Sequence, residues 1–539
     1  MELLDLPTDV LLLVFSHIYG QDALNVALTS KQLVDLALPR VAAVIECWGP
    51  SMLRRLHAYM LSSANTRPDV PLRAVHLRKL TLDVCIFFDG KGSTLQIPDV
   101  AVVSSDQYFR RDFSGARLIG DLLVNAPNLR ELHFNWFEPC MTQDPRIGSA
   151  LCSMTSLRKL TLRTLGDSTV NLLSACPSDI RHLGLSYCLP HGSFVQNDSK
   201  TFPVLLNALA SFRNLRILEL WTFSPPESFS TNFTPPHFPS ITYLRLSDSS
   251  PLALDMVALC PNLSTLIYSG WEVMAASLPR SGLPWPPLKR LLLEEHEYVP
   301  DVLGRLSRVE RLHIGGQLPV PVDDDQDMAH LLELVHIASP VELYLCLLVE
   351  STPVTYWSQI APNAPRLRVV EVKVEIPSPE LQYDGWLDDL PHALRPLSVP
   401  CLRVYLPCLR HASVIWPDAR PNPAGQMARR AAAREMELRR AESVRTLPQR
   451  LADALPSLRY LALLDDGPNE YNLRGNRNEV VAERIGNDDH NKWDELRRVE
   501  CVKSHKWWRI VGSADARTLE PISVEEGEQA QEELMRSVQ

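Results

Sequence analysis

The chain has 539 residues, which is too long for one compact core and predicts either several domains or one elongated array. Its 45% hydrophobic and 22% charged content is ordinary for a folded protein and excludes global disorder. The net charge of −10 gives no reason to expect nucleic acid as a partner.

The cysteines and the apolar runs limit the kinds of site and compartment that we expect. The 11 cysteines are scattered and no two of them form a Cys-x-x-Cys pair, so we expect reduced thiols, no metal site and no cofactor. The first residues lack the basic charge of a signal peptide, and no stretch approaches the roughly 18 apolar residues of a membrane span. We therefore expect a protein of the cytoplasm or the nucleus, neither secreted nor bound to a membrane.

Three short amphipathic helices are predicted within the first 47 residues. The first has apolar residues at three- and four-residue steps: Val10, Leu11, Val14, Phe15 and Ile18. A second helix is expected from about Asp22, and Thr29 and Ser30 offer an N-cap for a third. Because three such helices make too small a core to stand alone, the module is expected to dock onto something larger.

The residues of this module carry a family resemblance. The segment from Leu6 to Arg40 resembles an F-box, the motif that binds the Skp-family adaptor of Skp–cullin–F-box ubiquitin ligases, and it is similar to the large F-box families of mushroom-forming fungi. The resemblance implies an F-box domain over residues 1–47, which binds the adaptor and through it a cullin. The residues that it places at the adaptor are Leu6, Pro7, Val10, Leu11, Val14, Phe15, Leu24, Leu28, Ser30 and Lys31.

An ordinary three-helix cap on a repeat array is the alternative interpretation of this module. The two differ in where the apolar residues lie. A cap turns its apolar face inward, whereas an F-box leaves Leu6, Pro7, Leu11 and their neighbours exposed for a partner.

A Leu-x-x-Leu-x-Leu phrase returns along the rest of the chain. Its clearest copies begin at Leu129, Leu157, Ile180, Leu215, Ile241, Leu263, Leu288, Val309, Leu367 and Leu458, with weaker copies at Leu77 and Leu496. From Leu129 to Val309 the starts are 28, 23, 35, 26, 22, 25 and 21 residues apart. These steps straddle the roughly 20–29-residue period of leucine-rich repeats.

Prolines punctuate the same pattern. Six of the 43 prolines stand two residues before a phrase: Pro127, Pro239, Pro261, Pro286, Pro365 and Pro456. Proline cannot continue a helix, so each one favours the end of a helix and the start of a strand. The sequence therefore predicts an α/β protein in which an irregular leucine-rich-repeat solenoid over residues 48–523 places parallel strands on a concave face and helices on a convex face.

The repeats depart from a regular leucine-rich array in one respect. Regular repeats keep an Asn or Cys three residues after the last leucine, where it hydrogen-bonds the turn between coils, and this chain has no such asparagine ladder. We therefore expect uneven coils, with a less certain register after about residue 320. An inserted charged helix is predicted over about 424–445, and a disordered acidic tail over 524–539.

No pattern typical of a catalytic site is present. The sequence lacks a Gly-rich phosphate loop, a Gly-x-Ser-x-Gly elbow and a His-Glu-x-x-His pair, so we do not expect an enzyme. His133, His182 and His313 lie inside repeat phrases, which favours outward-facing histidines on separate coils over a metal cluster. Cys176 and Cys260 recur at the same place before a phrase, which favours packing over reactive thiols.

The strand phrases also predict a binding surface. Because side chains alternate along a strand, the neighbours of the buried leucines are expected on the concave face. Trp, Tyr and Arg are the usual anchors of interfaces. The predicted target-binding face therefore contains Arg163, Trp221, Tyr243, Arg245, Arg290, Glu294 and His313. The plainer alternative is that Trp221 packs under a loop.

These features lead to one main functional hypothesis and two others. The main one is the substrate-recognition subunit of a Skp–cullin–F-box ubiquitin ligase, in which the F-box binds the adaptor and the repeat face binds an unknown target protein. The alternative is a leucine-rich-repeat interaction scaffold outside any ligase. An enzyme with an unrecognised site would require a cluster of titratable groups in a pocket, which the sequence does not suggest.

Overall fold

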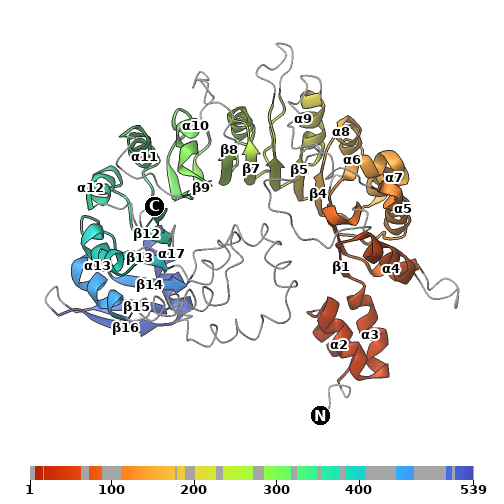
Figure 1. Cartoon of the computed structure of the whole chain (residues 1–539), viewed down its shortest axis with the longest axis horizontal. Helices are drawn as coiled ribbons and strands as arrows, with labels where there is room; N and C mark the ends of the chain where they lie inside the picture. Colours follow the sequence, from red (N-terminus) through yellow and green to blue (C-terminus); the bar gives the residue numbers. More distant parts are fainter. Residues whose placement is uncertain are drawn as a thin grey trace, which may run out of the picture. The chain divides into compact units, whose positions relative to one another are not determined.

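The chain folds as two compact units, Met1–Leu278 (unit 1) and Pro279–Gln539 (unit 2), in a computed structural model (Figure 1). This division differs from the predicted domain boundary after residue 47. The structure describes residues 6–15, 17–61, 72–87, 112–176, 179–187, 201–225, 235–270, 285–316, 325–348, 354–375, 383–406, 445–465, 506–512 and 516–537. The predicted helix at 424–445 and the weak repeat at Leu496 lie outside these residues, except for Arg445.

Unit 1 begins with the three predicted helices, α1 (Thr8–Phe15), α2 (Gly20–Thr29) and α3 (Lys31–Val41). A parallel sheet follows whose described strands lie in sequence order, and the unit's remaining helices lie along one face of it (Figure 1). The strands are β1 (Val44–Cys47), β2 (Lys79–Leu82), β3 (Glu131–Phe134), β4 (Lys159–Arg163), β5 (His182–Ser186), β6 (Ile217–Trp221), β7 (Tyr243–Ser249) and β8 (Thr265–Gly270). The α-helices between strands are α4 (Pro50–Leu61), α5 (Ala116–Val124), α6 (Phe137–Gln143), α7 (Arg146–Ser153), α8 (Asp167–Leu173) and α9 (Thr201–Ser211), and the 3-10 helices are η3 (Arg73–His76), η4 (Val84–Phe87), η6 (Phe113–Gly115) and η7 (Pro251–Leu259).

Unit 2 repeats this plan and closes it differently. Its described strands are β9 (Leu288–Leu293), β10 (Val309–Ile314), β11 (Glu342–Leu348), β12 (Val369–Glu375), β13 (Cys401–Leu406) and β14 (Tyr460–Asp465), which are parallel, and then β15 (Lys506–Val511) and β16 (Thr518–Ile522), which are antiparallel. The helices are η8 (His296–Tyr298), α10 (Val299–Leu303), α11 (Asp325–Ala338), α12 (Val354–Asn363), α13 (Tyr383–Leu394), one over 445–454, and α17 (Val524–Arg536).

Aligned leucines form the core of each sheet. The central apolar residue of each strand from β2 to β14, a leucine in all but one case, pairs in register with the central apolar residue of the neighbouring strand in the same unit. All of these residues are buried. In unit 1 this row is Leu80, Leu132, Leu160, Leu183, Leu218, Leu244 and Leu266. In unit 2 it is Leu291, Leu312, Leu343, Val370, Leu402 and Leu461. The predicted α/β array of parallel strands is thereby confirmed.

Backbone hydrogen bonds fix where each coil starts. The carbonyl oxygen of Arg130 accepts hydrogen bonds from the backbone N–H groups of Arg158 and Lys159, at 2.8 and 3.0 Å. The carbonyls of Arg158 and Arg181 accept two N–H donors from the following coil in the same way. Because this bond uses only backbone atoms, it sets the register without an asparagine ladder.

The turns after several strands also compensate for the missing ladder. The left-handed backbone region is rare for bulky and β-branched residues, yet three of them adopt it after strands. They are Trp136, Thr164 and Thr222, with φ values of 62°, 59° and 53°. In each case the next residue is buried in the core, as Phe137 and Phe223 are. The strained residue therefore turns the chain so that an apolar side chain occupies the place where a ladder asparagine would lie.

Several elements were not predicted correctly. Strands β1, β13 and β16 are part of the array, although the sequence analysis identified no phrase in any of them. The predicted disordered tail is wrong for residues 524–536, which form α17. A capping box begins this helix: the Ser523 hydroxyl accepts from the Glu526 N–H at 3.2 Å, and the Glu526 carboxylate accepts from the Ser523 N–H at 3.1 Å.

A single carboxylate joins two coils on the helical side of unit 1. Glu138 in α6 accepts hydrogen bonds from the backbone N–H groups of Ser168 and Thr169 at 3.1 and 2.8 Å, and from that of Gly166 at 3.3 Å. These N–H groups belong to the start of α8 and have no partner within the helix. The side chain therefore caps the next coil from outside it.

We predict that Glu138→Gln destabilises unit 1 by about 1–2 kcal/mol, because the amide presents one acceptor oxygen and no charge to the first turn of α8. The free energy of unfolding by urea measures this change. The same substitution at Glu131, half-buried on β3, is the control and should stay within roughly 0.5 kcal/mol of the wild type. Equal losses for both variants would contradict the capping role.

Candidate functional site

The N-terminal helical module has a small core of its own. Leu11 and Phe15 of α1 are buried against Leu33 and Ala37 of α3. The expectation that Leu11 stays exposed is therefore wrong: it lies four residues before Phe15, on the face of α1 that packs inward. Both residues stabilise the module itself in the free chain.

A second set of apolar residues in the module is exposed. It consists of Val10, Leu13, Val14, Leu24, Leu28 and Val34. Leu28 is 77% exposed and Leu13 is 64% exposed. Four of the six were predicted at the adaptor, whereas Leu13 and Val34 were missed. The signal was present, because the apolar run from Leu11 to Phe15 is too continuous for all of its side chains to face one core.

The remaining predicted adaptor residues are placed as follows. Pro7 is exposed, whereas Leu6 and Ser30 are half-buried. The side chain of Lys31 lies outside the described residues. The structure thus combines a buried apolar stripe with an exposed one, and adaptor binding stays a prediction.

In unit 1, the sheet face opposite the helices (the front face) is built around a tryptophan. Trp221 ends β6 and is half-buried, and its ring lies over β5, where a Cβ on Gly184 would come within 2.8 Å of the ring carbon Cζ3. The guanidinium carbon of Arg163, at the end of β4, lies 5.5 Å from the ring centroid. This distance permits a cation–π contact. Three neighbouring strands therefore hold the indole against the sheet.

The neighbouring positions on this face are polar. His182 Nε2 lies 3.4 Å from Glu219 Oε1, and both side chains are nearly buried. Tyr243 and Arg245 on β7 are half-buried, and Arg245 Nε donates to the Ser247 hydroxyl at 2.8 Å. His182 therefore stands on the front face, as strand alternation predicts, but it is buried because its side chain turns along the sheet toward a carboxylate.

The other predicted target-binding residues lie in unit 2. Arg290 on β9 and Glu294 just after it are half-buried. His313 on β10 is buried, with its Nε2 atom 3.0 Å from Glu342 Oε1 and its Nδ1 atom 3.3 Å from Arg290 Nη2. His313 therefore stands on the face opposite the helices, as strand alternation predicts, but it is buried because it joins two charged side chains across neighbouring strands. The predicted patch is thus divided between the units.

Helix α17 lies on the front face of unit 2, which is again the sheet face opposite the other helices. It contacts β12, β14 and β15, on the side of the sheet away from α11, α12 and α13 (Figure 1). Gly527 packs on the buried Trp507, since a Cβ there would lie 2.2 Å from the ring. Met535 joins an apolar cluster with Trp507, Tyr344 and Tyr405. Strands β12 and β14 are therefore covered on both faces, whereas Arg290 and Glu294 at β9 stay half-buried.

A charged network lies beneath this helix. The Gln531 side chain donates to Glu342 and Glu371, at 3.0 Å each, and accepts from Arg403 at 3.0 Å. Tyr405 donates to the second oxygen of Glu371 at 2.7 Å. Burial would raise the pKa of Glu342, but the hydrogen bond and charge of His313, helped by nearby cationic and amide groups, hold that pKa well below its usual range. Glu342 is therefore ionised at neutral pH.

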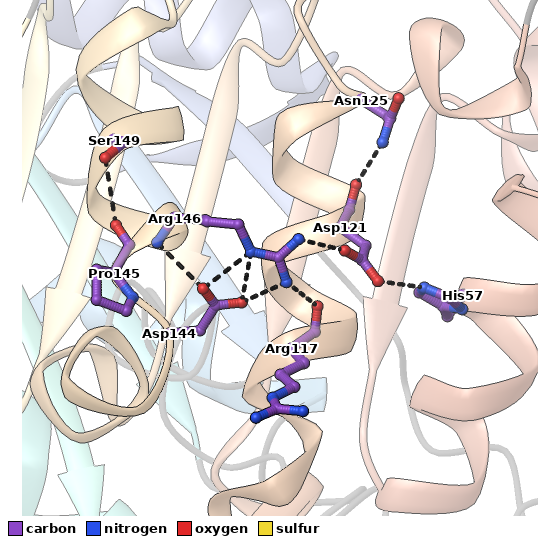
Figure 2. A network of polar contacts seen from close by, with 8 residues as sticks. All are labelled: His57, Arg117, Asp121, Asn125, Asp144, Pro145, Arg146 and Ser149. Carbon is purple, nitrogen blue, oxygen red and sulfur yellow. Dashed lines mark hydrogen bonds and ion pairs between the residues drawn. The ribbon is translucent and has the colours of Figure 1, made fainter.

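A further cluster of titratable groups lies on the helical side of unit 1 (Figure 2). Arg146 donates to Asp121 and to Asp144, at 2.7 Å each, and His57 Nε2 lies 3.1 Å from the second oxygen of Asp121. The hydrogen bond from the Arg146 guanidinium lowers the pKa of Asp144. Because these charges are paired with one another between α4, α5 and the start of α7, the cluster acts as a structural clamp.

The cysteines behave as packing residues. Cys176 and Cys260 are both buried, and burial raises the pKa of Cys260 to about 12 and that of Cys176 as well. A thiol with a raised pKa carries little thiolate, the reactive form. This supports the interpretation that the two cysteines fill equivalent core positions.

In the part of the chain that the structure describes, no group of three or more His, Cys, Asp or Glu side chains could hold a metal ion. No helix among these residues is both long and apolar enough to span a bilayer.

Comparisons with known proteins give similarities among solved structures alone. No protein-family model matches the chain, and no curated protein matches its sequence. Among solved structures, the chain is similar to the leucine-rich repeat-containing protein LegL7 from Legionella pneumophila, at 17% sequence identity and a TM-score of 0.30, covering 52% of this chain and 83% of that one. The strand order and register given above define the fold.

The position of Trp221 leads to a prediction for Gly184. Gly184→Ala should destabilise unit 1 by about 1–3 kcal/mol, because the added methyl group collides with the indole ring. In a Trp221→Ala background, Gly184→Ala should lower the free energy of unfolding by much less. Urea unfolding of the two single variants and the double variant measures this coupling. Additive losses would show that the ring does not lie over β5.

Proposed function

We propose that this chain is a non-catalytic interaction scaffold that binds a partner protein through the front face of unit 1. The observation that carries the proposal is the placement of Trp221 on β6 beside Arg163 on β4, with the indole ring lying over the intervening strand β5. Trp and Arg dominate the binding energy of most protein interfaces. Because both side chains stand on sheet positions, little conformational entropy is lost when a partner covers them.

The surroundings of Trp221 support the same function. Tyr243 adds a second half-buried aromatic residue on the next strand, and Arg245 adds a second cation. The buried pair His182 and Glu219 forms a polar floor beneath these residues. A half-buried aromatic centre with polar neighbours has the anatomy of a protein-binding patch.

Site-specific photocrosslinking tests this proposal. A benzoylphenylalanine at position 243, on the front face, should give a partner adduct of defined mass in cell extract. Trp221→Ala should reduce that adduct roughly tenfold or more, since hot-spot truncations cost at least 1.4 kcal/mol. The matched control is the same crosslinker at position 117, exposed on α5 on the helical side. Equal adducts at both positions would contradict the proposal.

A second candidate function is the substrate receptor of a Skp–cullin–F-box ubiquitin ligase. It is favoured by the exposed apolar side chains of α1, α2 and α3, which exceed what a small helical cap needs to leave in water. In this role the module would hold a Skp-family adaptor while the repeat face presents a target. Catalysis would occur in trans, by raising the effective concentration of a target lysine near the conjugating enzyme.

Co-purification with a Skp-family adaptor tests the second candidate. Leu13→Asp with Leu28→Asp should reduce bound adaptor at least tenfold, because both charges would enter a desolvated interface. Neither residue belongs to the module's buried core, so the fold should survive. Val124→Asp, at an exposed apolar position on α5, is the matched control. If the double variant co-purifies with as much adaptor as the wild type, the receptor assignment is contradicted. The scaffold proposal is not affected by that result.

A further inference from the structure

The contacts of Gln531 differ from those of an ordinary helix on a sheet. Its amide nitrogen donates to two carboxylates, one on β11 and one on β12, while its amide oxygen accepts from Arg403 on β13. Two acceptors and one donor are what a primary carboxamide can satisfy in this position. A carboxylate there would face two negative charges, and an ammonium group would face the guanidinium.

The residue after Gln531 is recognised as well. The Arg311 guanidinium on β10 pairs with the Glu532 carboxylate. On the same side of α17, Gly527 and Met535 stand four residues before and four residues after Gln531, and both pack on the sheet. The sheet therefore contacts a small residue, a carboxamide, an acidic group and a long apolar side chain along one stripe of the helix.

The sheet residues beneath the helix form a prepared site. Glu371 is fixed by Tyr405 and Arg403, and Glu342 is fixed by His313. These partners stand on the sheet and not on α17, so each of the two carboxylates has a hydrogen bond that is independent of the helix. Apolar side chains of the same cluster as Tyr344 and Tyr405, including Trp507 and Ala462, supply the apolar part of this surface.

The contacts that hold α17 on the sheet are of a kind that another helix could replace. Its polar contacts replace hydrogen bonds to water, so each contributes only about 0.5–3 kcal/mol net. Its buried apolar positions are Gly527, Ala530 and Met535, two of which are small, and Val524 and Leu534 pack against the same cluster while staying partly exposed. A helix held in this way opens at a lower free energy than the strands beneath it.

We propose that the front face of unit 2 is a helix-binding surface that recognises a Gln-Glu pair. Within the chain, α17 is the helix bound to this surface. The partner is an amphipathic helix with a small residue, a Gln-Glu pair that begins four residues later, and a long apolar residue four residues after the Gln. Such a helix competes with α17 for Glu342, Glu371, Arg403 and Arg311. The inference extends the scaffold proposal to a second face and uses none of the residues around Trp221.

The test uses the full-length chain and a change in the ligand alone. Gln531→Glu keeps the shape of the side chain but places a third carboxylate between Glu342 and Glu371, so α17 should be released. Gln529→Glu makes the same change at an exposed position of the same helix and is the matched control. The probe is a labelled peptide of residues 523–537, stapled between the exposed positions 529 and 533 so that it is helical.

The expected result is that the peptide binds the Gln531→Glu chain at least tenfold more tightly than the wild type or the Gln529→Glu chain, because only the first has a vacated face. A peptide carrying Glu in place of Gln at position 531 should lose at least tenfold in affinity. Equal binding to all three chains, or equal binding of both peptides, would overturn the proposal.

Hydrogen exchange of the wild-type chain gives a readout that does not depend on the variant folding. The amides of α17 should exchange through an opening that leaves β11, β12 and β13 protected. Exchange of the helix and these strands at one common rate would make α17 a permanent part of the core and would also overturn the proposal. Loss of peptide binding with crosslinking at position 243 intact would separate its failure from that of the scaffold proposal.

Discussion

Each coil of this chain buries one central apolar residue, in most cases a leucine, against that of the coil before it, and the rest of the structure depends on this alignment. Strands in a sheet lie about 4.8 Å apart, so a buried row of side chains fixes both register and direction. A single carbonyl that accepts two N–H donors from the next coil sets the starting point of several coils, as Arg130 does. Together these two features replace the asparagine ladder of a regular repeat array.

Because helices occupy one face of each sheet, the other face is the variable part of the architecture. In unit 1 it carries an indole ring held over Gly184 by Arg163. In unit 2 the corresponding face carries Glu342, Glu371 and Arg403, and α17 lies upon them. One repeating backbone thus presents two chemically different surfaces, since strand alternation leaves the outward positions free of any packing role in the leucine core.

Among the described residues, the buried carboxylates of the sheets have partners on adjacent coils. His182 with Glu219 and His313 with Glu342 each join two successive strands. On the helical side, the exposed Arg146 pairs with the buried Asp144 and with Asp121 on α5. Such pairs add little net stability, because the loss of hydration offsets the attraction. They do penalise a slipped register, in which a buried charge would lose its partner.

The sequence by itself determined the repeating part of the fold. Apolar residues at fixed steps predict strands such as β4 and β6, since burial of one strand face follows from period alone. It also contained the Ser-x-x-Glu signature that starts α17, although the low apolar content of that segment outweighed it. Only the tertiary structure decided what the helix does. Gly527, Gln531 and Met535 acquire a role when Trp507, Glu342 and Arg403, far away in the sequence, are brought beneath them. The same holds for His313, whose burial depends on a carboxylate 29 residues later that the parallel register places beside it.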